Sequence, residues 1–163
     1  MSESAERRGL LVAQLMVASV WLGGAILFVA VVAPAAFAAL PTRALAGALV
    51  GAVLPPLFYS GIVAGAVLVL VALASRRRKF VTSGTVGGVL VALSCAAAQF
   101  IVEPRIERVR ASIDGAVESL APSDPRRIAF GRLHAASVLW LGAASIGTVI
   151  AAAGAAASLR RTA

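Results

Sequence analysis

Four long stretches of the chain contain no charged residue. Asp, Glu, Lys and Arg are absent from residues 9–42, 44–75, 80–102 and 133–159, which are 34, 32, 23 and 27 residues long. A helix of about 20 apolar residues crosses the roughly 30 Å hydrocarbon core of a bilayer, because each residue adds about 1.5 Å. The pattern therefore predicts four transmembrane helices, over approximately residues 10–39, 44–74, 83–103 and 127–158.

The other structure that can span a bilayer is a closed β-barrel. Its strands alternate apolar and polar residues over about ten positions, and the chain shows no such segments. The sequence therefore predicts an all-α fold, an integral membrane bundle of four transmembrane helices. Residues 1–163 are expected to form a single domain.

The third predicted span continues beyond the membrane as an amphipathic helix over about residues 104–120. It is expected to bend at Pro104, because proline has no N–H to donate. Asp124 or Ser123 is expected to cap the fourth helix, with Pro125 in its first turn. The apolar positions that recur at helical spacing along the extension are Val102, Ile106, Val109, Ile113, Val117 and Leu120.

Composition narrows the function classes. The chain is 60% hydrophobic, and it holds one Cys, one His and two Met. These are too few ligands for a zinc site or a bis-histidine haem, so no metal and no cofactor are expected. The spans contain no carboxylate pair and no Ser/His/Asp arrangement, so no catalytic residue and no enzyme activity are predicted. The net charge of +8 comes from arginines beside the spans, which favours lipid headgroups over nucleic acid.

Orientation is expected from the basic block Arg76-Arg77-Arg78-Lys79 between the second and third spans. Short basic loops stay on the cytoplasmic side, so both termini are predicted to be cytoplasmic. The excess of Arg over Lys and the many alanines hint at a bacterial protein, and hence at a multi-pass protein of the plasma (inner) membrane.

Small residues and prolines punctuate the spans. Small-xxx-small spacing allows helix backbones to approach closely in lipid. Proline at three positions is expected to interrupt the first two helices, either as static packing geometry or as a hinge beside a cavity. The packing candidates are Gly23 (with Ser19), Gly47, Gly51, Gly61, Gly65, Gly84 and Gly88, and the expected kinks are Pro34, Pro55 and Pro56.

Polar residues gather where the third and fourth spans reach the outer surface. Gln99 and Glu103 are one turn apart on the third helix, and His134 and Ser137 share a face of the fourth. An intramembrane histidine suggests a functional site, although it also serves simply to hydrogen-bond a neighbouring helix. The candidate polar cluster is His134, Ser137, Gln99, Glu103 and Arg105.

These motifs resemble the transmembrane-protein-205-like family of four-span proteins. The resemblance covers essentially the whole chain and implies a four-helix membrane domain, known in bacteria mainly as a domain of unknown function. It also implies that His134 and Ser137 form the family's Leu-His-x-x-Ser element. Trp140-Leu141 departs from the pattern, because polar residues such as Asn are expected there. The matching segments are Trp21-Leu22-Gly23-Gly24, Phe28, Val32-Ala33-Pro34-Ala35-Ala36-Phe37, Ala46-Gly47, Gly51, Pro104-Arg105-Ile106 and Phe130-Gly131-Arg132-Leu133-His134-Ala135-Ala136-Ser137.

Three functions are compatible with these features. The first is a non-enzymatic accessory or structural subunit, packed against other membrane subunits or further copies of itself through small-residue faces. The second is a transporter or binder of a small solute or metal that uses the polar cluster. The third, with the least support, is a haem-linked membrane enzyme.

Overall fold

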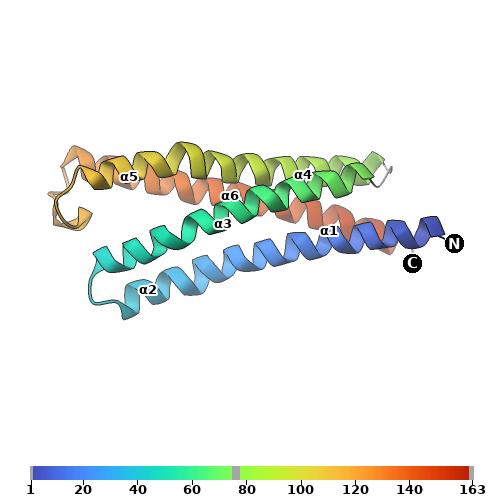
Figure 1. Ribbon diagram of the computed structural model, residues 1–163, viewed down its shortest axis with the longest axis horizontal. Helices are drawn as coiled ribbons and strands as arrows, with labels where there is room; N and C mark the ends of the chain where they lie inside the picture. The colour runs from blue at the N-terminus through green and yellow to red at the C-terminus, as the bar shows by residue number, and fades with distance from the viewer. Residues whose placement is uncertain (1, 75–77, 162–163) are drawn as a thin grey trace.

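The computed structural model describes residues 2–74 and 78–161. Four helical rods follow one another (Figure 1). The basic block expected to set the orientation begins at Arg76, so part of it lies outside the described residues. The rods are α1 (Ser2–Leu27), η1 (Phe28–Val32) and α2 (Ala33–Ala39), then α3 (Arg43–Ala74), then α4 (Arg78–Ala97), η2 (Ala98–Val102) and α5 (Glu103–Ala111), and, after the short η3 (Val117–Ser119), α6 (Pro125–Arg160).

Four helices in the described residues are long and apolar enough to cross a membrane. Large apolar side chains cover their outward faces: Val20 is 77% exposed and Leu139 is 74% exposed. Such a surface is unfavourable in water and suits the hydrocarbon of a bilayer. The predicted all-α membrane bundle, with α5 as its amphipathic extension, is therefore confirmed.

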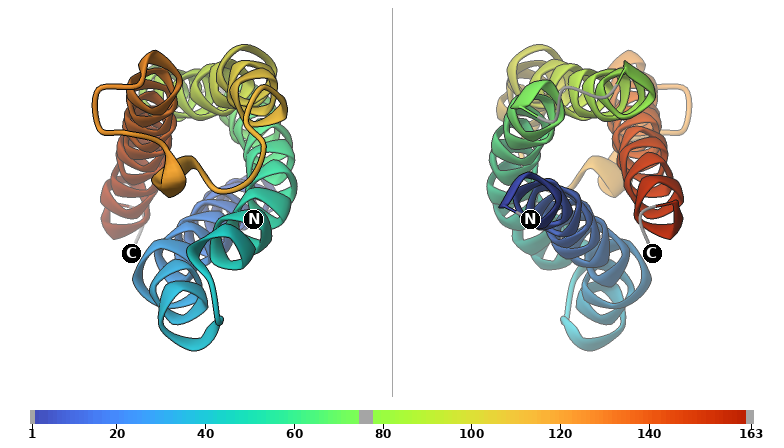
Figure 2. Two further views of the ribbon diagram at one scale, coloured as in Figure 1. Left: turned by 90° about the vertical axis from the view of Figure 1, so that its left-hand side faces the viewer. Right: turned by 90° about the vertical axis from the view of Figure 1, so that its right-hand side faces the viewer.

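The four rods form a ring in which α1 contacts α3 and α6, and α4 contacts the same two helices. The N- and C-termini lie at one end, called here the termini end (Figure 1). The opposite end, the loop end, carries residues 40–42 and the segment 112–124. There α2 and the start of α3 separate from α5 and the start of α6, as the view along the bundle also shows (Figure 2).

Adjacent glycines of α4 bring its backbone against both neighbouring helices. A β-carbon at Gly88 would lie 2.7 Å from the carbonyl oxygen of Gly65 on α3. A β-carbon at Gly87 would lie 2.5 Å from the carbonyl oxygen of Gly147 on α6. Both distances are too short for any side chain, so the backbones of α3, α4 and α6 touch directly at these crossings.

Helix α1 is attached differently, by two buried side chains. The Trp21 indole Nε1 donates to the carbonyl of Leu57 on α3 at 3.2 Å. The Gln14 amide Nε2 donates to the carbonyl of Ala151 on α6 at 2.9 Å. Buried amide and indole groups that bond neighbouring helices stabilise association in lipid, where apolar burial contributes little.

The prolines of the first and third rods follow π-helical turns. Ahead of Pro34, the backbone N–H of Ala33 donates to the carbonyl of Phe28, five residues back. Ahead of Pro104, the backbone N–H of Glu103 likewise donates to the carbonyl of Ala98. The wider turn absorbs the missing proline donor and the clash of its ring with the preceding turn.

Pro55 and Pro56, where a kink is expected, do not break the second predicted span into two helices. Both prolines lie inside α3, which continues without a break from Arg43 to Ala74. A helix in lipid tolerates internal proline where neighbouring helices and local adjustments compensate for the lost hydrogen bonds.

The amphipathic extension ends earlier than expected, and the prediction of a helix to residue 120 is wrong. Helix α5 stops at Ala111, where the Ser112 N–H bonds back to the Val109 carbonyl at 3.1 Å. Gly115 follows with a φ of 112°, a left-handed conformation that glycine adopts without strain and that turns the chain away from the helix axis. The later apolar positions therefore pack from a loop.

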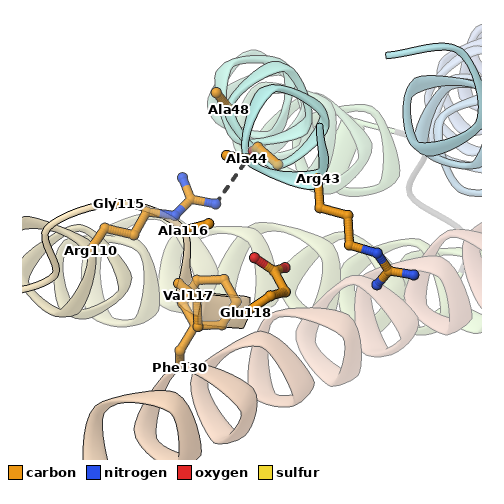
Figure 3. A pocket seen from close by; sticks show the side chains of 10 residues that line it. Arg43, Ala44, Ala48, Arg110, Gly115, Ala116, Val117, Glu118 and Phe130 are labelled. Carbon is orange, nitrogen blue, oxygen red and sulfur yellow. Dashed lines mark hydrogen bonds between the residues drawn. The ribbon is translucent and has the colours of Figure 1, made fainter. Parts of the chain in front are cut away.

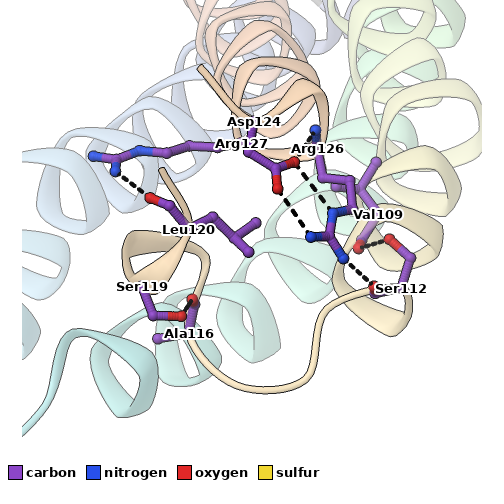
Figure 4. A network of polar contacts seen from close by, with 8 residues as sticks. All are labelled: Val109, Ser112, Ala116, Ser119, Leu120, Asp124, Arg126 and Arg127. Atoms are coloured by element: carbon purple, nitrogen blue, oxygen red, sulfur yellow. Dashed lines mark hydrogen bonds and ion pairs between the residues drawn. The ribbon is translucent and has the colours of Figure 1, made fainter. Parts of the chain in front are cut away.

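Two arginines at the start of α6 fix this loop (Figure 4). Arg126 Nη1 donates to the Ser112 carbonyl at 3.0 Å, and Arg127 Nη1 donates to the Leu120 carbonyl at 2.7 Å. Arg126 also pairs with Asp124 at 2.9 Å. Asp124 is the N-cap of α6, as expected, because its side chain accepts from the Arg126 backbone N–H at 2.8 Å.

We expect the Asp124 cap to make stability depend on pH. Hydrogen bonds from the side chain and backbone of Arg126 hold the pKa of the Asp124 carboxyl below its usual range. The ionised Asp124 carboxylate therefore stabilises the fold above about pH 4, the usual pKa of an aspartate. This stabilisation is lost as the pH falls through the lower pKa of the folded state. The difference in thermal midpoint between the wild type and Asp124→Ala should therefore be largest near pH 7 and shrink at acidic pH. Asp124→Asn, which caps without titrating, is the control; a pH-independent difference contradicts the prediction.

Candidate functional site

The separated helix pairs at the loop end enclose a cavity of about 330 Å³. Its lining comes from α2, α3, α5, α6 and the 112–124 segment, so the site depends on the whole loop end. Charged and polar groups occur together with apolar side chains, which distinguishes it from an ordinary gap between helices. The lining residues are Phe37, Arg43, Gly47, Val50, Gly51, Leu54, Glu103, Ile106, Arg110, Glu118, Phe130, His134 and Ser137.

Arg110 crosses from α5 to α3 within this cavity. Its Nη2 donates to the Gly47 carbonyl at 3.3 Å, and its Nη1 lies 3.4 Å from the Glu107 carboxylate. A β-carbon at Gly51 would lie 2.8 Å from Nη1, so glycine at this position leaves room for the guanidinium. The two glycines thus admit a charged side chain to the face of an otherwise apolar helix.

On the α6 side of the cavity, Phe130 contacts both Arg110 and His134. The Arg110 guanidinium lies 5.5 Å from the centre of its ring, a cation–π distance. The His134 imidazole stacks on Phe130 with ring centres 6.4 Å apart and planes 6° from parallel. Ser137, one turn further into the bundle, is buried.

A smaller hollow of about 170 Å³ adjoins the cavity on the outside and shares Arg43, Gly47, Arg110, Glu118 and Phe130 with it. Figure 3 shows the side chains of Arg110 and Glu118 reaching into this space from α5 and η3, with the Arg43 side chain beyond Glu118 and its guanidinium directed away from Arg110. Glu118 belongs to η3, within the loop that Arg126 and Arg127 fix. The loop therefore supplies a carboxylate to the cavity mouth.

The structure brings together part of the predicted polar cluster. Glu103, His134 and Ser137 line the cavity, but Gln99 and Arg105 do not. Gln99 is buried one turn deeper in η2, and its Oε1 has no hydrogen-bond partner in the described part of the chain. Arg105 is exposed, because it lies two residues from Glu103 and so on another face of the helix.

The sequence interpretation missed Arg43, Arg110, Glu118 and Phe130. Helical spacing offered a signal for two of them: Glu103, Ile106 and Arg110 recur at i, i+3 and i+7, and Phe130 lies one turn before His134 on α6. Arg43 and Glu118 come from separate elements, and no spacing along the chain links them to the others.

The predicted packing glycines divide into three groups. Gly61, Gly65, Gly84 and Gly88 lie against neighbouring helices, with Gly61 facing Trp21 and Cys95. Gly47 and Gly51 face the Arg110 side chain rather than a helix backbone. Gly23 has no described atom within 4 Å of its β-carbon position and is exposed, so it lies on the outward face of α1, where any helix that packs on it would come from outside the described bundle.

A larger hollow of about 460 Å³ lies between α1 and α3. Its lining is almost entirely apolar, with the hydroxyl of Ser60 and the indole of Trp21 as the exceptions. An open apolar groove on a lipid-facing surface accommodates acyl chains without selecting them. The cavity at the loop end, which combines charge with apolar lining, is therefore the better candidate for a specific site.

The 99 residues from 16 to 114 match a family model described as a domain of unknown function, DUF4149. This is more than half of the 163 residues. The chain belongs to the DUF4149 family. The DUF4149 match includes Arg43, Glu103 and Arg110 of the cavity and ends before Glu118 and α6.

No curated protein and no solved structure matches the chain. In the residues that the structure describes, no group of three or more His, Cys, Asp or Glu is placed to hold a metal ion.

Proposed function

We propose that this DUF4149 protein binds a small amphiphilic molecule in the cavity at the loop end, as a membrane carrier or transporter. The observation that carries the proposal is the composition of the cavity wall. Arg43, Arg110, Glu103 and Glu118 provide charge, while Phe37, Val50, Leu54 and Ile106 provide apolar surface. A ligand with a polar head and an apolar body would satisfy both parts, as pockets with few polar groups on an apolar lining do elsewhere.

The position of the cavity supports entry from the membrane. Glu103 and Arg132 stand at the borders of two charge-free blocks, where helices leave the hydrocarbon. His134 and Ser137 lie just inside that border on α6. A lipid-like molecule would thus keep its head at the interface while its body enters between the helix pairs.

Replacing Arg110 should remove the ligand. Arg110→Ala deletes a guanidinium that faces the cavity, and we expect about tenfold less amphiphile to co-purify, the loss typical of one charge-assisted hydrogen bond. Arg108→Ala is the matched control, because Arg108 is exposed on the same helix and its Nε donates to the Pro104 carbonyl one turn earlier. The measurement is mass spectrometry of solvent extracts from protein purified in mild detergent. Equal amounts from Arg110→Ala and Arg108→Ala, or none from the wild type, would contradict the proposal.

A second candidate is an accessory subunit that packs against another membrane protein or a further copy of the chain. The small residues Ser19 and Gly23 on α1 favour it, because both are exposed and no described atom lies within 4 Å of the Gly23 β-carbon position. Gentle extraction followed by identification of co-purifying proteins tests it: a stoichiometric partner supports it, and a lone monomer carrying a small molecule opposes it.

The remaining assignments are proposals on sequence grounds. They are a plasma-membrane location in a bacterium, cytoplasmic termini, kinship with the transmembrane-protein-205-like group, and action without enzyme activity or cofactor. A haem-linked enzyme has no support from the arrangement of the site, and an absorbance spectrum tests it directly.

A further inference from the structure

The cavity wall carries equal numbers of cationic and anionic side chains. Arg43 and Arg110 contribute two guanidinium groups, and Glu103 and Glu118 contribute two carboxylates. Within the described part of the chain, Arg43, Glu103 and Glu118 take part in no ion pair, while Arg110 has one long contact with Glu107. Glu103 and Arg110 are half-buried, and charges held partly out of water without a close opposite charge favour a charged group that enters the space. Arg43 and Glu118 are exposed at its mouth.

Neither a pure anion nor a pure cation suits this wall. An anionic head would gain from the two arginines and be repelled by the two glutamates, and a cationic head would meet the reverse. A head with both charges would use all four side chains. The three labelled charged residues of Figure 3 come from α3, α5 and η3, so complementary charges reach the ligand from different sides.

The aromatic lining indicates which kind of cation fits. Quaternary ammonium groups are usually held against open aromatic faces. The lining holds two phenylalanines, and Phe130 is already engaged by the Arg110 guanidinium and the His134 imidazole. Phe37 alone does not make the aromatic cage in which quaternary ammonium groups are bound. Carboxylates instead accept hydrogen bonds from N–H groups, which a primary ammonium has and a quaternary ammonium lacks.

We infer that the ligand is a zwitterionic amphiphile whose phosphate or carboxylate binds Arg43 and Arg110, and whose primary ammonium binds Glu103 and Glu118. This inference rests on the proposed amphiphile site and names its ligand class. The same head chemistry occurs in a lipid and in a free phosphoethanolamine, so the test separates the two sources.

Native mass spectrometry of the full chain tests the head preference with three lipids of identical acyl chains. Phosphatidylethanolamine has a phosphate and a primary ammonium, phosphatidylcholine has a quaternary ammonium, and phosphatidylglycerol has no cation. We expect phosphatidylethanolamine to be retained about tenfold more than either of the others. In the double variant Glu103→Gln/Glu118→Gln, this preference should disappear while phosphatidylglycerol binding stays or rises. Glu107→Gln is the matched control, because Glu107 is exposed and does not line the cavity.

Each contrary result has a distinct meaning. Preference for phosphatidylglycerol overturns the zwitterion inference, and equal binding of phosphatidylcholine overturns the assignment of a primary ammonium. Either result leaves the amphiphile site standing. Lipid retention that is unchanged in Arg110→Ala overturns the proposed function itself. Displacement of the lipid by free phosphoethanolamine at equal concentration would overturn the assignment to an amphiphile and indicate a soluble ligand with the same head, whereas failure to displace supports the lipid.

Discussion

Replacing Gly88 by alanine should destabilise the bundle by about 2 kcal/mol, within the range for overpacked cores. The new methyl group would lie 2.7 Å from the Gly65 carbonyl oxygen and 2.8 Å from the Val69 side chain. Because the closest of these atoms is backbone, α3 and α4 must move apart to admit it. The separation would propagate, since the neighbouring Gly87 holds α6 by the same kind of contact.

The matched control is Gly142→Ala on α6. No atom lies within 4 Å of the Gly142 β-carbon position, so the substitution adds helix propensity without a clash. Alanine is favoured over glycine in a helix interior by about 0.5–1 kcal/mol, and Gly142→Ala should therefore be neutral or stabilising. Unfolding in mixed detergent–SDS micelles, followed by circular dichroism, measures both variants. Equal midpoints for Gly88→Ala and Gly142→Ala would show that the crossing is wider than described.

The glycines also show what sequence could and could not specify. Small-xxx-small spacing identified Gly65 and Gly88, which lie at a helix crossing, but it also selected Gly23, which faces outward. It missed Gly87 and Gly147, which form the α4–α6 contact. Spacing records that two glycines share a helix face, whereas the direction of that face depends on how the four helices are arranged.

The spans were predictable because a charge in hydrocarbon is costly, and this cost leaves a direct record in the sequence. The end of α5 was not, because the apolar period continues past Ala111 while the backbone leaves the helix at Ser112 and turns at Gly115. Apolar residues at helical spacing pack equally well from a loop. Local backbone preference decided the outcome there, and the periodicity did not.

The cavity could be predicted only in part. Glu103, His134 and Ser137 were predicted because polar residues at the edge of a membrane span are rare and often mark a functional site. Arg110 could have been predicted from its helical spacing with Glu103. Arg43 and Glu118 could be placed at the cavity only from two features of the folded chain. One is the separation of the helix pairs at the loop end, and the other is the path of the loop that Arg126 and Arg127 fix. Both are tertiary features.

Replacing Trp21 by alanine should detach α1 from the bundle, with a loss of about 3 kcal/mol, the lower end of the range for buried Trp→Ala substitutions. Trp21 is 5% exposed, and its indole fills the space beside Gly61 while bonding the Leu57 carbonyl. Within the described residues, α1 makes no glycine crossing of the kind that joins α3, α4 and α6. Its attachment therefore depends strongly on Trp21 and on Gln14.

Two further variants separate packing from hydrogen bonding at this position. Trp21→Phe keeps a ring and loses the N–H donor, so it should cost about 1 kcal/mol. Trp140→Ala is the control, because Trp140 is 39% exposed on α6 and its removal should change little. The measurement is again unfolding in mixed micelles, and a Trp21→Ala midpoint equal to that of Trp140→Ala would contradict the prediction. Helix α1 continues through η1 into α2, whose Phe37 lines the cavity. Trp21→Ala should therefore also lower amphiphile retention, even though Trp21 lies far along the rod from the charged residues of the cavity.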